Sequence, residues 1–170
     1  IRYLLTRGGP LASNSIEAIA YLRSGLPGHG ELDLKYYLVP ILTGTEEPAQ
    51  EHGVSNLVIL TRPESRGHLR LRSADPMDTP IIDANYLSDE RDRAVLREGI
   101  RIARGIFSQP AYDRYRGREY LPGAHCVSDE ELDEFFRQTC SVNYEAVGTC
   151  KMGHDDLAVV NDQLQVHGVQ

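Results

Sequence analysis

The sequence predicts an α+β fold, in which an antiparallel β-sheet carries helices packed on one of its faces. Two observations support this class. In the first half of the chain the apolar residues alternate with polar ones or form short runs, whereas in the second half they recur at helical spacing. Strands therefore precede the long helices instead of alternating with them, which favours an antiparallel sheet. The 170 residues are enough for one domain with its own core.

Three segments are predicted to be strands. Residues 31–42 alternate at first, and Pro40 ends the pattern or places it at a sheet edge. Residues 56–61 contain the apolar run Leu-Val-Ile-Leu, and residues 68–72 alternate leucine with histidine and arginine. Because the turn-forming residues 63–67 separate the last two segments, we predict that 56–61 and 68–72 form an antiparallel pair.

Helices are predicted at three places. Residues 13–22 have the composition of a short helix. A longer helix is expected to start at Ser88 and to stop at the Gln-Pro pair at 109–110. Ser128 is followed three residues later by Glu131, which is the pattern of a capping box at the start of a helix.

Composition and charge exclude several classes of function. The formal charge is −7, so the chain lacks the basic field that general nucleic-acid binding needs. No apolar run approaches the about 20 residues of a membrane-spanning helix, and no secretion signal is visible, so a cytoplasmic location is expected. Three widely spaced cysteines fit reduced thiols, and no spacing of cysteine and histidine predicts a metal site.

The carboxy-terminal sequence carries the most specific pattern. Residues 141–153 are SVNYEAVGTCKMG, and residues 158–161 and 164–169 are AVVN and LQVHGV. Shorter motifs precede them in the chain: RGGPLA at 7–12, RPESRG at 62–67, SADP at 73–76 and NYL at 85–87. In this order, and over nearly the whole chain, these motifs resemble the carboxy-terminal region of the glucose–methanol–choline (GMC) flavoprotein oxidoreductases.

The resemblance implies a division of the chain and a cofactor. Residues 1–157 would form the family's substrate-binding domain, and residues 158–170 would begin the segment that returns to the FAD-binding domain. The family's GxGxxG motif belongs to an amino-terminal region, and this sequence has no such motif. The implied cofactor is therefore FAD, bound mainly by the missing flavin-binding portion of the same protein, and the chain is not expected to be active alone.

The resemblance also implies a reaction and its residues. Family members oxidise small-molecule alcohols, such as choline, aryl or aliphatic alcohols and sugars, by passing hydride to the flavin while a histidine takes the hydroxyl proton. Glu145 stands where the family has this histidine. We expect Asn143 and Tyr144 to contact substrate beside it. The flavin would contact the next part of the motif, made up of Val147, Gly148 and Thr149.

The substitution at position 145 leaves two interpretations open. A carboxylate can accept a proton from an alcohol where its surroundings make it basic enough, so Glu145 can act as the base. However, a carboxylate stays anionic or becomes neutral, whereas a protonated histidine is cationic and stabilises a reduced, anionic flavin. The alternative is therefore a catalytically inactive fragment or a module that binds a ligand or partner. Asn161, where the family usually has aspartate, is a lesser departure, and His167 is expected to be a structural surface histidine.

Overall fold

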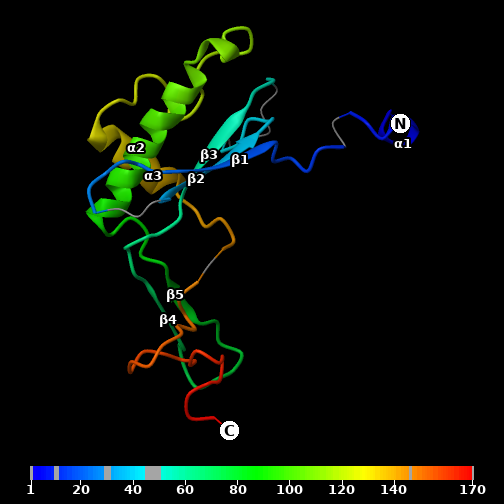
Figure 1. The fold of residues 1–170 in the computed structure, drawn as a ribbon. Helices are drawn as coiled ribbons and strands as arrows, with labels where there is room; N and C mark the ends of the chain where they lie inside the picture. The colour runs from blue at the N-terminus through cyan, green and yellow to red at the C-terminus, as the bar shows by residue number, and fades with distance from the viewer. Residues whose placement is uncertain (1, 10–11, 29–31, 45–50, 146, 170) are drawn as a thin grey trace. The chain divides into compact units, whose positions relative to one another are not determined.

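The computed structural model describes residues 2–9, 12–28, 32–44, 51–145 and 147–169 (Figure 1). Residue 31 of the predicted strand at 31–42, residues 10 and 11 of the RGGPLA motif, and residues 45–50 lie outside these residues. The chain forms two compact units, Ile1–Ser65 with Leu87–Cys140, and Arg66–Tyr86 with Ser141–Gln170. The elements are α1 (Arg2–Thr6), β1 (Ala18–Leu22), β2 (Leu34–Val39), β3 (Ser55–Leu60), β4 (His68–Arg70), β5 (Ile81–Asp83), α2 (Glu90–Phe107), a 3₁₀ turn (Pro110–Tyr112) and α3 (Asp129–Thr139).

The first unit contains a three-stranded antiparallel sheet in the order β1-β2-β3. The central strand pairs Tyr36 with Ala20 on one side and with Val58 on the other. Leu34 and Tyr36 point to the face that α2 covers, and both are buried. Helices and antiparallel strands in one unit confirm the predicted α+β class, and the strands expected at 31–42 and 56–61 are confirmed in their central parts.

The helix predicted at residues 13–22 is wrong, because β1 occupies Ala18–Leu22. This strand pairs with β2 over its full length, from Ala18 opposite Leu38 to Leu22 opposite Leu34. The amide of Glu17 continues the ladder by donating to the carbonyl of Leu38 at 2.9 Å. Pairing with a strand that lies well beyond the segment itself outweighs a weak local preference for helix.

The predicted pairing of residues 56–61 with 68–72 is also wrong. β4 pairs with β5 instead, with Leu69 opposite Ile82 in a separate two-stranded sheet. The connection after β3 does not turn back, because the carboxylate of Asp92 accepts hydrogen bonds from the amides of Glu64 at 2.7 Å and Ser65 at 2.8 Å. These bonds hold the connection at the amino-terminal end of α2.

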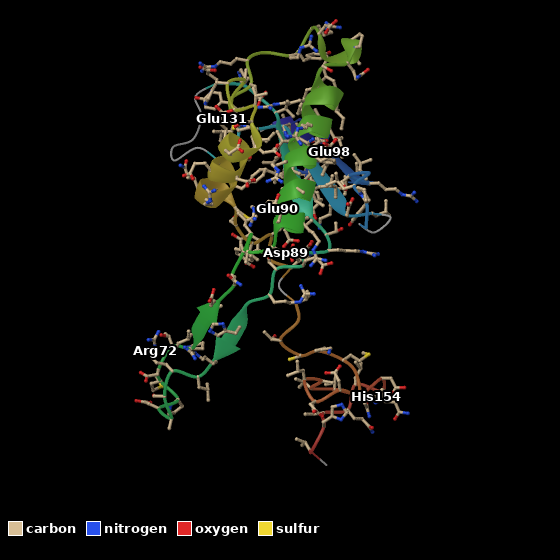
Figure 2. The ribbon with its side chains drawn as sticks, turned by 90° about the vertical axis from the view of Figure 1, so that its left-hand side faces the viewer. Arg72, Asp89, Glu90, Glu98, Glu131 and His154 are labelled. Carbon is tan, nitrogen blue, oxygen red and sulfur yellow. The ribbon has the colours of Figure 1, made fainter. Side chains whose placement is uncertain are left out.

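Both long helices begin at side-chain caps. In α2 the cap is Asp89, one residue after the predicted Ser88, and its carboxylate accepts from the amide of Arg91 at 2.9 Å. Figure 2 shows Asp89 and Glu90 at this end of α2, where carboxylates favour the positive end of the helix dipole. The predicted capping box of α3 is confirmed, with Ser128 and Glu131 bonding to each other's backbone. No helix in the described part of the chain is long and apolar enough to cross a membrane.

The core of the first unit lies between α2 and the sheet, and continues between α2 and α3 (Figure 1). Tyr36 reaches across this layer, and its hydroxyl donates to the carbonyl of Gly99 at 2.8 Å. Burial raises the pKa of this hydroxyl above its ordinary value. On the other side of α2, Leu132 and Phe136 of α3 are buried beside Leu96. The helices therefore stack on one face of the sheet.

An ion-pair cluster joins the two helices. Arg97 of α2 is buried, and its Nη1 donates to both carboxylate oxygens of Asp133 at 2.8 and 2.9 Å. Its Nη2 also pairs with Glu90. Because the arginine is buried, the carboxylates of Asp133 and Glu90 are needed to stabilise its positive charge, and removing either side of the cluster would leave charges without a partner.

We predict that replacing Arg97 by alanine destabilises the first unit by about 3 kcal/mol, since Asp133 loses its bidentate partner at a buried interface. Arg101 provides the control, because it bonds to Asp129 from a more exposed position on the same helix. Its replacement by alanine is expected to cost less than about 1 kcal/mol. Urea unfolding followed by circular dichroism measures both changes, and equal midpoints for the two variants would contradict the prediction.

Candidate functional site

The predicted site residues lie in one loop of the second unit. Residues 141–145 and 147–149 belong to no helix or strand. Tyr144 adopts a left-handed conformation with φ 56°, which costs an L residue about 1 kcal/mol or more. Gly148 has φ 105°, a conformation that glycine adopts readily and other residues rarely do. Residues 141–145 and 147–149 therefore do not form a continuous strand.

The side chains of this loop are presented on the surface of the unit. Tyr144 is 95% exposed and Val147 is 91% exposed. Glu145 and Thr149 are exposed as well, and only Asn143 is half-buried. Ala146 lies outside the described residues. Neighbouring apolar side chains that are this exposed are typical of a surface that contacts a ligand or another protein surface.

Backbone hydrogen bonds attach the far end of the loop to the chain that follows it. The carbonyl of Lys151 accepts from the amides of Val159 at 2.8 Å and Val160 at 3.3 Å. The amide of Gly153 donates to the carbonyl of Val160 at 2.9 Å. Met152 thus forms a parallel bridge with Val160, which in turn forms an antiparallel bridge with Val166. Residues 158–167 fold back along the motif.

Asn161 organises the turn of this returning segment. Its side-chain Oδ1 accepts from the amides of Gln163 at 2.9 Å and Gln165 at 3.0 Å, and its Nδ2 donates to Gln165 Oε1 at 3.0 Å. An aspartate could make the first two bonds but not the third. The residue that departs from the family pattern therefore performs a local structural task, which the Asn-Asp pair at 161–162 signals as a turn.

Lys151 of the motif forms an ion pair with Asp155, four residues further along the chain. The ammonium group of Lys151 lies 2.5 Å from Asp155 Oδ2, and this hydrogen bond lowers the pKa of the Asp155 carboxyl. The amide of Leu157 donates to the same carboxylate. In the described part of the chain, no group of three or more His, Cys, Asp or Glu side chains is placed to hold a metal ion.

Comparison with known proteins identifies the class of this chain. Residues 63–170 match the family described as GMC oxidoreductase, which is more than half of the sequence. The chain belongs to this family and corresponds to its carboxy-terminal region. It is 43% identical over 161 residues to an oxygen-dependent choline dehydrogenase of Klebsiella pneumoniae (strain 342), covering 94% of this chain and 29% of that protein.

Solved structures agree with this assignment. The pyridoxine 4-oxidase of Mesorbium loti matches with a TM-score of 0.79 and 29% identity, over 92% of this chain and 31% of that one. An FAD-dependent oxidoreductase from Chaetomium thermophilum matches with a TM-score of 0.67 and 29% identity, over 82% of this chain and 22% of that one. The chain thus spans less than a third of the length of the curated relative and of the oxidase.

Sequence reasoning placed the site residues in one segment but did not find how the segment is held. The left-handed Tyr144 has no local signal in the sequence, because tyrosine rarely takes this conformation. The bridges to residues 158–167 were also missed. Leu164 and Val166, which stand two residues apart after a turn signal, were the available indication of an extended returning segment.

We predict that Asn161→Ala loosens the returning turn, because two amide donors lose their acceptor. The expected result is about fivefold faster hydrogen exchange at the amides of Gln163 and Gln165, as for the loss of one typical hydrogen bond. Asn161→Asp is the matched control, since it keeps both acceptor positions, and it should retain most of the protection. Equal exchange in the alanine and aspartate variants would contradict this account of the turn.

Proposed function

We propose that this chain is the substrate-binding part of an FAD-dependent alcohol oxidoreductase in which Glu145 takes the hydroxyl proton. Residues 1–157 would be the substrate-binding domain, and residues 158–170 the beginning of the return to the FAD-binding domain. The partner in this arrangement is the flavin-binding portion of the same protein. Membership of the GMC family and the similarity to a choline dehydrogenase support the reaction class.

The observation that carries the proposal is the exposed loop around Glu145. Its carboxylate, the phenol of Tyr144 and the side chain of Val147 are all accessible on one short segment. A base must come within hydrogen-bond reach of the proton that it removes, and an exposed side chain on an irregular loop meets that requirement. Asn143, which is half-buried, and Tyr144 would form the wall beside the base.

In this proposal Val147, Gly148 and Thr149 would contact FAD. A Cβ added at Gly148 would meet nothing within 4 Å, so the backbone there is open to a ligand. Val147 offers an apolar side chain next to it, and Thr149 offers a hydroxyl. FAD, when bound, supplies the acceptor for the hydride that leaves the alcohol carbon. The residues of this chain would hold the edge of the cofactor and move the proton.

A second candidate function is a module that binds a ligand or partner without catalysis. Glu145 itself favours it, because the family has a histidine at this position. A protonated histidine would add a positive charge beside the reduced cofactor, and a glutamate cannot do this. In this candidate the same exposed loop would serve recognition alone.

We predict that the protein that carries this chain with its flavin-binding portion shows bound flavin absorbance, and that an alcohol bleaches it. Glu145→Gln should then lower the rate of flavin reduction by about 100-fold or more, since general base catalysis contributes at least that much. Stopped-flow spectroscopy with choline, an aryl alcohol, an aliphatic alcohol and a sugar measures the rate for each substrate class.

Glu145→His separates the two candidates. If glutamate is the working base, the histidine variant should be slower than the original protein or equal to it. A large gain in turnover with histidine would instead show that Glu145 disables the site, and would support the non-catalytic module. Asp162→Asn, which alters another exposed carboxylate of the same unit, should leave the reduction rate within about twofold of the original.

A further inference from the structure

One side-chain hydrogen bond connects the returning segment, residues 158–167, to the end of the motif at residues 141–153. His167 Nε2 lies 3.1 Å from the carbonyl oxygen of Gly153, and the amide of His167 donates to the carbonyl of Val159 at 3.0 Å. Gly153 is the last residue of this motif. The backbone of His167 thus bonds to Val159 within the returning segment, and its ring bonds to the last residue of the motif.

The chemistry of this contact fixes the state of the ring nitrogen. A carbonyl oxygen can only accept a hydrogen bond, so Nε2 of His167 carries the proton. The ring is therefore a hydrogen-bond donor to the backbone of Gly153.

The described residues of the loop, 141–145 and 147–149, form no regular secondary structure of their own. Tyr144 holds an unfavourable left-handed conformation. A loop in this condition samples several paths unless bonds outside it select one. The bonds to Lys151 and Gly153 lie directly beyond the residues that would meet the cofactor.

We propose that His167 is a positioning residue, which holds the carbonyl of Gly153 and thereby the path of the Val147–Gly153 segment. It would act through the backbone and not through contact with substrate or cofactor. This inference rests on the proposed function, because the segment matters for reaction only if it faces FAD. It assigns a role to a histidine that its alternating sequence context predicts to be structural and exposed.

Hydrogen exchange tests the attachment without requiring activity. His167→Ala removes the donor, and His167→Gln retains an amide donor of similar reach. His154→Ala is a control on a second exposed histidine of the same unit (Figure 2). We expect the amides of Gly153 and Val160 to exchange about fivefold faster in His167→Ala, to stay near the original in His167→Gln and to be unchanged in His154→Ala. Equal exchange in His167→Ala and His154→Ala would overturn the proposal.

The flavin-loaded protein tests the consequence. His167→Ala should lower kcat several-fold with KM unchanged, and His167→Gln should restore most of it, whereas a purely structural role would leave the turnover of correctly folded, flavin-bound protein intact. If wild-type protein reduces flavin with an alcohol and His167→Ala matches it, the role of His167 is rejected and the proposed function stands. If the wild-type protein binds no flavin, the proposed function itself is rejected.

Discussion

The close contact between α2 and the sheet at Gly99 is the constraint on which the first unit depends. A Cβ at this position would lie 2.6 Å from Val58 Cγ1 and 3.1 Å from Leu34 Cδ2, so only glycine lets the helix approach this far. The same closeness brings the carbonyl of Gly99 within reach of the Tyr36 hydroxyl. With α2 fixed against the sheet, α3 packs against the other side of α2. Asp92, in the first turn of α2, accepts the hydrogen bonds that hold the chain leaving β3.

The sequence predicts well those features whose causes are local. Ser128 and Glu131 stand three residues apart and bond to each other's backbone, so the start of α3 can be predicted from that spacing alone. The strand at Ala18–Leu22 and the partner of β4 depend on segments that come together only in the folded chain. The bonds from Asp92 to Glu64 and Ser65 likewise join positions that no short pattern connects.

The candidate site shows the same division between local and distant causes. A glycine at position 148 is compatible with a positive φ, and the structure has φ 105° there. The exposure of Tyr144 and Val147 could not be inferred, because apolar side chains are ordinarily expected inside. Tyr144 and Val147 stand three residues apart, and neighbouring exposed apolar side chains are typical of surfaces that contact a ligand or another protein surface.

Residues 141–170 carry few positive charges that could stabilise a negatively charged cofactor. Lys151 is the only lysine or arginine in residues 141–170, and its ammonium group is engaged by Asp155 at 2.5 Å. When a carboxylate accepts the proton it becomes neutral, so it adds no positive charge, whereas a histidine would. This segment therefore offers little electrostatic stabilisation of an anionic flavin. Under the proposed function, that stabilisation would come from groups other than Glu145 and Lys151.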